Sequence, residues 1–137
     1  MDFGEVRIGL ALSDETRTLA SPLATLRRRR GKRPPLGQIE VAAKEHHVRD
    51  VVVGLPLDLS GEETAWSGEV RRMAAELGSR LDLPVHLVDE RMTSVRAERA
   101  IRTIGLPRGK REEKDRVDAA AAAIILQGWL DRKAGER

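Results

Sequence analysis

The stretch Val51-Val52-Val53-Gly54-Leu55-Pro56 decides the fold, because six consecutive residues carry no polar side chain. A strand with one face in water alternates apolar and polar residues, whereas a strand of a parallel sheet, covered on both faces, does not alternate. The stretch therefore predicts a central strand in a sheet that has helices on both faces.

Further strands and helices are predicted on both sides of this stretch. Before it, alternation predicts a strand over residues 6–12. A further short strand is predicted over residues 19–26, where Pro22 indicates an edge or a bulge. Apolar spacing and turn residues predict the remaining elements: a helix over 36–47, a helix face over 70–81, a strand over 85–88, a helix from 93 or 94 to 105, a charged loop over 106–116 and a last helix over 116–133. This order predicts an α/β fold with a mixed sheet, in a single domain over residues 1–137.

Composition excludes several classes of protein. The 137 residues include no cysteine, which rules out disulfides and thiolate zinc sites. No apolar run approaches the roughly 20 residues that span a bilayer, and nothing resembles a signal peptide, so we expect a cytoplasmic protein without a membrane partner. Aromatic residues make up only 2% of the chain, too few for a platform on which bases stack, so any nucleic acid is expected to be bound through its backbone and shape.

Three carboxylates stand where predicted elements begin or end. Asp2 precedes the first strand, Glu90 follows the strand over 85–88, and Asp118 lies at the entry to the last helix. Acidic residues that are scattered along a chain but gathered in space are a common way to hold hard divalent cations. The pattern points to metal-dependent hydrolysis of phosphodiesters.

Two of these acids also have a purely structural interpretation. Asp118 follows Asp115 by three residues, so Asp115 could cap the last helix with Asp118 as the favourable acid of its first turn. Spacing alone does not decide which of the two would bind metal. Glu90 could simply pair with Arg91 on a surface loop.

Two basic stretches are candidate contacts for nucleic acid. Residues 27–33 hold six cations in seven positions and are followed by Pro34-Pro35; the alternative is a solvated turn. The second stretch precedes Asp118 and consists of Arg108, Lys110, Arg111, Lys114 and Arg116, interspersed with three acids. Cations that neutralise phosphates would make binding strongly dependent on salt.

Four motifs occur along the chain in a recognisable order. They are Asp2-x-Gly4-x-x-Arg7-Ile8-Gly9-x-Ala11-x-Ser13-Asp14, then Val52-Val53-Gly54-Leu55-Pro56-Leu57 with Gly61 beyond, then Asp89-Glu90-Arg91-x-Thr93, and last Val117-Asp118-Ala119-Ala120-Ala121. With them the chain resembles the YqgF/RuvX family of bacterial ribonuclease H-like proteins over nearly its whole length. That family is described as Holliday-junction resolvases and as nucleases that process the 5′ end of pre-16S ribosomal RNA.

The resemblance implies a fold, a metal site and a set of contacts. The fold would be a ribonuclease H-like, five-stranded mixed sheet whose first strands are antiparallel. Asp2, Glu90 and Asp118 would be the catalytic residues and would hold two Mg²⁺ or Mn²⁺ ions roughly 3.5–4 Å apart. The expected substrate contacts are Arg7, Arg91, Arg108, Lys110, Arg111 and Lys114. The expected partner is nucleic acid (structured RNA, with branched DNA as the alternative), bound by a monomer or a homodimer.

The chain departs from the family pattern at its start. Family members carry some five or six residues before the first aspartate, and these form a central strand, whereas Asp2 here follows Met1 directly. We therefore expect the first strand to be truncated. A terminal ammonium next to Asp2 would compete with metal for the carboxylate. We hypothesise that the natural start of the chain lies upstream of Met1.

Three functions remain in competition. The first is an endonuclease that acts on structured RNA during ribosome maturation, and the second is a DNA-junction resolvase, which would work as a two-fold dimer. The third is a nucleic-acid-binding module with impaired catalysis. An actin-like ATPase, which also opens with Asp-x-Gly, is excluded because 137 residues leave no second lobe, and no phosphate-binding glycine loop of the Walker type is present.

Overall fold

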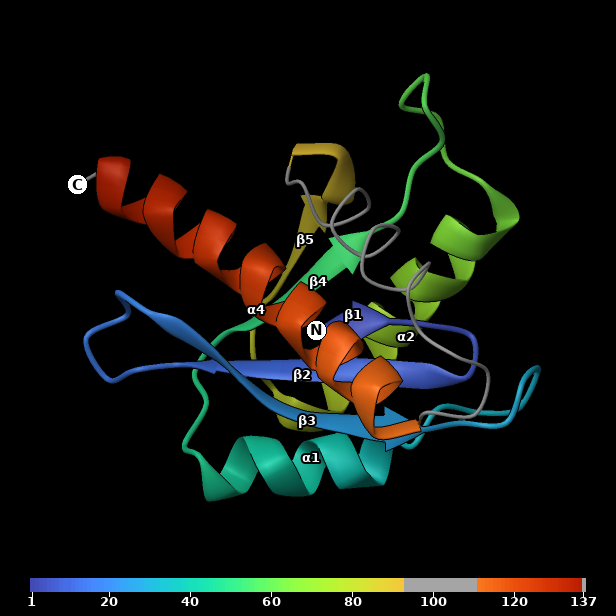
Figure 1. Ribbon diagram of the computed structural model, residues 1–137, viewed down its shortest axis with the longest axis horizontal. Coiled ribbons are helices and arrows are strands. Elements are labelled where there is room, and N and C mark those ends of the chain that lie inside the picture. Colours follow the sequence, from blue (N-terminus) through green and yellow to red (C-terminus); the bar gives the residue numbers. More distant parts are fainter. Residues whose placement is uncertain (93–110, 137) are drawn as a thin grey trace.

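A computed structural model describes residues 1–92 and 111–136 (Figure 1). Its elements are β1 (Asp2–Phe3), β2 (Arg7–Ser13), β3 (Ala20–Arg27), α1 (Leu36–Glu45), β4 (Val51–Leu55), α2 (Ala65–Leu81), β5 (Val85–Asp89), the 3₁₀ turn η1 (Glu90–Met92) and α4 (Arg111–Gly135). The predicted helix over 93–105 lies outside the described residues.

The described strands form two sheets that meet at Met1. Strands β1, β2 and β3 are antiparallel neighbours, and β4 pairs with β5 in parallel. Met1 joins the sheets, since its α-amino nitrogen donates to the carbonyl of Val52 at 2.6 Å and its carbonyl accepts from the amide of Gly54 at 3.1 Å. The prediction of an α/β fold with about five strands in a mixed arrangement is confirmed, with β1 only two residues long.

Strand β4 has helices on both of its faces, as its unbroken apolar sequence predicts. Val51, Val53 and Leu55 belong to the core that contains α1 and α2. Val52 belongs to a second core with Ala121 and Ile125 of α4. In Figure 1, α4 accordingly crosses one face of the strands, whereas α1 and α2 belong to the core on the other face.

Strands β1 and β2 divide their side chains between the same two faces. Phe3 and Ile8 are buried in the core with α1 and α2, and Phe3 stacks on Trp66 with ring centroids 5.3 Å apart. Successive side chains of a strand point to opposite faces. Asp2 and Gly9, which are partners across the β1–β2 ladder, therefore face α4.

Strand β3 is the edge strand that Pro22 predicts. Pro22 pairs opposite Ala11, next to a shift in register between Leu10 and Ala11. A proline has no amide hydrogen for the ladder and is accommodated at an edge or a bulge.

Local signals set the ends of α2. Thr64 caps its first turn by accepting from the amide of Ser67 at 3.3 Å, and the Ser67 hydroxyl accepts from the amide of Thr64 at 2.6 Å. Such a reciprocal pair satisfies amides that a helix start leaves without partners. At the other end Asp82 adopts a left-handed conformation, and the chain turns into β5.

The last helix begins earlier than the sequence pattern predicts. Residues 111–116 are the first turns of α4 and are not part of a loop, so Asp118 lies two turns inside the helix. The capping interpretation of Asp115 and Asp118 is therefore wrong. The charged side chains of this segment are compatible with a helix, and the hydroxyl of Thr25 in β3 anchors the helix by donating to the carbonyl of Asp115 at 2.6 Å.

Within the described ranges, no helix is both long and apolar enough to cross a lipid bilayer.

Candidate active site

The three predicted acids are the buried charged side chains of the described structure. Asp2 is 4% exposed, Glu90 6% and Asp118 8%, and Ser67 is the one other buried polar residue in the described ranges. Burying a carboxylate is unfavourable unless its surroundings compensate the charge. Buried carboxylates are therefore candidates for a functional site.

Gly9 brings Asp118 next to Asp2. Gly9 is the ladder partner of Asp2, and a β-carbon on Gly9 would lie only 2.1 Å from the backbone oxygen of Asp118. Because glycine has no β-carbon, the α4 backbone can lie directly against β2 at this point. This contact places Asp118 on the face of the sheet to which Asp2 points.

Gly54 makes room for Glu90 in the same way. A β-carbon on Gly54 would lie 2.8 Å from Oε1 of Glu90 and 2.7 Å from Cδ1 of Ile125 in α4. The amide of Gly54 also donates to the carbonyl of Met1, the residue before Asp2. The three acids thus come from the start of β1, the turn after β5 and the second turn of α4, and they converge on the α4 face of the sheet.

Arginines on β2 and β3 engage the acidic side of α4. Nε of Arg7 donates to Oδ2 of Asp118 at 2.5 Å, and Nη2 of Arg27 lies 2.8 Å from Oδ1 of Asp115. Arg7 and Arg27 are partners across the β2–β3 ladder, and Asp115 and Asp118 are one turn apart on α4. We call these four residues the Arg–Asp quartet.

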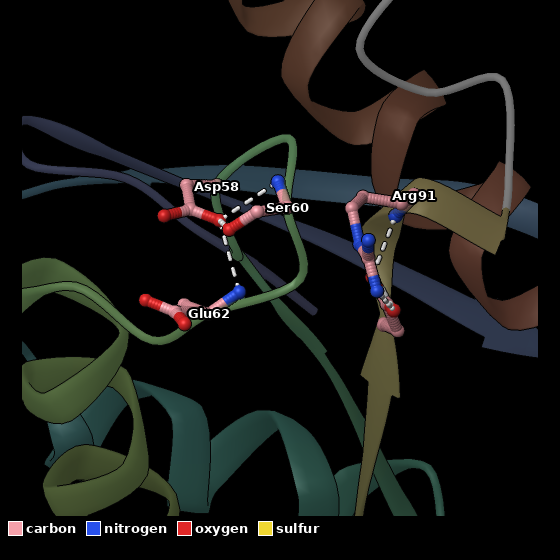
Figure 2. Close-up of polar contacts among 5 residues, drawn as sticks. Asp58, Ser60, Glu62 and Arg91 are labelled. Atoms are coloured by element: carbon pink, nitrogen blue, oxygen red, sulfur yellow. Dashed lines mark hydrogen bonds and ion pairs between the residues drawn. The ribbon is translucent and has the colours of Figure 1, made fainter.

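Arg91 pairs with Asp89 and does not pair with Glu90. Its Nη2 lies 2.7 Å from Oδ2 of Asp89, and its own amide donates to Oδ1 of Asp89 at 2.9 Å (Figure 2). The interpretation of Glu90 as the surface partner of Arg91 is therefore wrong. The bond to Asp89, reinforced by the charge of Asp58, raises the pKa of Arg91.

The loop between β4 and α2 lies beside Arg91. Oδ1 of Asp58 accepts from the amides of Ser60 and Glu62, each at 2.9 Å, and these bonds close the loop (Figure 2). The hydroxyl of Ser60, which donates to the same oxygen at 2.6 Å, lowers the pKa of Asp58 most, and the amide bonds add to this effect. A β-carbon on Gly61 would come within 2.8 Å of Nη2 of Arg91, so the guanidinium lies against the loop backbone.

The predicted substrate contacts are only partly described. Arg7, Arg91 and Lys114 are placed, whereas Arg108, Lys110 and the side chain of Arg111 lie outside the described structure. In the turn over 27–33, three arginines form ion pairs: Arg27 with Asp115, Arg30 with Glu5 and Arg33 with Glu76. Arg29 and Lys32 are exposed, and in the described ranges no carboxylate pairs with either.

The carboxylates of Asp2, Glu90 and Asp118 are suitable ligands for a hard divalent cation, but in this structure they do not surround a single ion position. Carboxylate oxygens are the ligands that Mg²⁺ and Mn²⁺ prefer. Within residues 1–92 and 111–136, however, no three acidic or histidine side chains are close enough to bind one ion together. One oxygen of Asp118 is held by Arg7.

The α-amino group of Met1 is buried beside this site. Burial lowers its pKa from 8.0 to about 5, and the nearby charge of Glu90 opposes the shift only in part. The expectation that a terminal ammonium competes with metal for Asp2 is therefore wrong near neutral pH, because the group is then an uncharged amine.

This buried amine predicts a pH dependence of stability. Because its pKa is lower in the folded state, the unfolded chain binds more protons between pH 5 and 8, and stability should rise with pH across that window. The fall in the pKa of this amine from 8.0 to about 5 corresponds to roughly 4 kcal/mol in the free energy of unfolding, gained as the pH rises from 5 to 8. Urea unfolding at a series of pH values would measure the slope.

A chain extended by a few residues before Met1 is the control. It carries an amide at this position and should lose this part of the slope, whereas every other ionisable group of the chain is still present. Equal slopes in the two chains would contradict the burial of the amine.

A cavity of about 940 Å³ lies near the beginning of β4 and the last turns of α4, and Met1 is among its lining residues. Its lining includes Asp50 at the start of β4 and Trp129 near the end of α4, and none of the three acids. The candidate site is therefore identified by the chemistry of its side chains and does not coincide with this hollow.

Sequence reasoning missed the part played by Gly9 and Gly54. Both belong to the quoted motifs, at positions where a strand would favour a larger residue. A glycine inside a predicted strand can mark the close approach of another backbone or group. The two glycines could therefore have been recognised as points of close approach, but the sequence does not show which segment of the chain approaches them.

Comparisons with known proteins bear on the family and the fold of this chain. The family model described as "RuvX: Holliday junction resolvase" matches residues 1–132. A protein of Anaeromyxobacter dehalogenans (strain 2CP-C) named "Putative pre-16S rRNA nuclease" is 43% identical, over 98% of this chain and 96% of its own length. A protein of the same name from Koribacter versatilis (strain Ellin345) is 42% identical, over 100% of this chain and 88% of its own length.

One solved structure supports the fold. It is described as "T. thermophilus RuvC in complex with Holliday junction substrate", and it is 19% identical with a TM-score of 0.54, over 98% of this chain and 93% of that chain. At this level of identity the likeness speaks for the fold alone, and it confirms the predicted ribonuclease H-like architecture.

Proposed function

Because the chain belongs to the RuvX family, we propose that it is a metal-dependent endonuclease that processes the 5′ end of pre-16S rRNA. The observation that carries the proposal is the convergence of Asp2, Glu90 and Asp118, all buried, on one face of the sheet. The choice of substrate rests on the name shared by relatives 42–43% identical over nearly the whole chain.

The three acids would hold divalent cations at the site. When bound, a cation pair activates a water molecule for attack on phosphorus and stabilises the charge on the leaving oxygen. The protein's contribution is to fix the carboxylates on rigid elements, and the close contacts at Gly9 and Gly54 do this.

Cations around the acid cluster would bind the substrate backbone. Lys114 lies one turn before Asp118 on α4, and Arg91 follows Glu90 directly. Both can reach phosphates close to the acids, and Arg29 and Lys32 in the basic turn can bind phosphates farther along the strand. This arrangement reads the backbone and requires no aromatic platform.

Cleavage of a four-way DNA junction is the second candidate function. The printed description of the family and the ribonuclease H-like fold support it. The acid cluster serves either substrate equally, so the two functions differ only in the nucleic acid that is recognised. A resolvase would also need to form a two-fold dimer, which sedimentation would detect.

The test is cleavage of end-labelled pre-16S leader RNA and of a four-way DNA junction, side by side, with Mg²⁺ or Mn²⁺. We expect cutting of the RNA that is lost in Asp118→Asn. The matched control is Asp115→Asn, one turn away on the same helix, which should still cut. Cutting of the junction alone would favour the second candidate, and cutting of neither would indicate a binding module.

A further inference from the structure

Arg7 occupies a position from which it can serve two partners. It lies on β2 one residue before Ile8, whose side chain is in the core with α1 and α2, so Arg7 points to the opposite, α4 face. Its side chain is 27% exposed, whereas that of Asp118 is 11% exposed. The guanidinium therefore lies at the boundary between the acid cluster and solvent.

Only one of the three guanidinium nitrogens of Arg7 makes a hydrogen bond to protein in the described structure. Nε donates to Oδ2 of Asp118 at 2.5 Å, and no protein acceptor is found in the described ranges for Nη1 or Nη2. A guanidinium presents its donors as a planar fork that matches two oxygens of a phosphate. Arg7 thus has donors available for a phosphate while it still holds Asp118.

The bond to Asp118 competes with any cation at the cluster. A carboxylate oxygen that accepts a short, charged hydrogen bond cannot direct the same lone pair to a metal ion. This contact is consistent with the absence, among the described residues, of three acids arranged around one ion. Ligation through Oδ2 of Asp118 would require Arg7 to withdraw, and the positive charge of Arg7 beside this carboxylate opposes the binding of a cation through Oδ1 as well.

We infer that Arg7 exchanges between two anions, Asp118 in the metal-free site and a backbone phosphate of the nucleic acid once a divalent cation takes Asp118. The inference rests on the proposed function. Because coupling between two ligands is reciprocal, nucleic acid that attracts Arg7 raises the affinity for metal, and metal that displaces Arg7 raises the affinity for nucleic acid. The chain would in this way load metal preferentially when substrate is present.

The test is calorimetric titration of Mn²⁺ into the metal-free protein, with Arg7→Gln compared with the unsubstituted chain. Without its competitor, Asp118 should bind Mn²⁺ more readily, and the affinity is expected to rise about 10-fold. Arg27→Gln is the matched control, since it removes the other arginine of the Arg–Asp quartet, which pairs with Asp115. It should leave Mn²⁺ affinity unchanged.

A second measurement follows the nucleic acid. The binding of labelled leader RNA, measured by fluorescence anisotropy with and without Ca²⁺, should tighten with the cation in the unsubstituted chain, and this gain should be lost in Arg7→Gln. Arg7→Lys keeps the charge but not the fork, so it should keep the lower Mn²⁺ affinity and lose most of the gain. This variant also keeps the inference testable if Arg7→Gln does not fold.

The outcomes separate the inference from the proposed function. If Arg7→Gln binds Mn²⁺ with unchanged affinity while the unsubstituted chain shows Asp118-dependent cleavage, the exchange of Arg7 is overturned and the proposed nuclease function stands. Failure of the unsubstituted chain and Arg7→Gln alike to bind Mn²⁺ would overturn both.

Discussion

Glu90→Gln is expected to lower the rate of nucleic-acid cleavage at least 100-fold while the protein remains folded. Glu90 is buried against Gly54, next to Ile125 of α4 and near the α-amino group of Met1. An amide has nearly the same shape but no negative charge, so it would hold a divalent cation poorly. Loss of the charge stabilisation that a metal site supplies accounts for several kcal/mol in the transition state.

Glu90→Gln should not reduce the stability of the protein. Removing one of several neighbouring negative charges relieves repulsion in the folded state, and active sites commonly gain stability when they lose function. Glu76→Gln, an exposed residue of α2 paired with Arg33, is the matched control and should keep full activity. Full activity of Glu90→Gln, measured in the same cleavage assay, would remove Glu90 from the proposed site.

Gly9→Ala is expected to have the largest effect on folding. The new β-carbon would lie 2.1 Å from the backbone oxygen of Asp118 and 2.5 Å from its carbonyl carbon. Neither atom is the end of a flexible side chain, so α4 as a whole must move away from β2. Overpacking of this kind costs about 1–3 kcal/mol, which lowers the melting temperature by on the order of 5–10 °C in a domain of this size.

The displacement should also separate Asp118 from Asp2, so cleavage is expected to fall with stability. Gly37→Ala is the control, because a β-carbon there would meet only Nη2 of Arg80, at 4.0 Å, in a helix where alanine is favoured. Thermal unfolding should give a lower midpoint for Gly9→Ala and an equal or higher one for Gly37→Ala. A stable and active Gly9→Ala would contradict the close contact between α4 and β2.

The two variants probe different parts of one arrangement. Glu90→Gln removes a charge and leaves the shape of the site intact, whereas Gly9→Ala keeps every carboxylate and changes only the spacing between α4 and β2. Loss of cleavage in both, with loss of stability in the second alone, would separate the chemistry of the site from the packing that assembles it.

The sequence by itself determined the elements and the candidate acids. The unbroken apolar run at Val51 predicted a strand covered on two faces, because burial of both faces leaves no position for polar residues. Pro22 predicted an edge strand because it lacks an amide hydrogen. The four motifs identified Asp2, Glu90 and Asp118, each of which the structure buries.

Only the tertiary structure decided which groups these residues meet. Arg7 and Asp118 are 111 positions apart, and Gly9 and Gly54 acquire their meaning from α4 and from the turn after β5. The start of α4 at Arg111 placed Asp118 inside the helix, and Arg91 turned to Asp89 and left Glu90 buried. The reason is physical: periodicity and turn chemistry act between neighbours in sequence, whereas the pairing of a carboxylate depends on distances of a few ångströms between segments that only the folded sheet brings together.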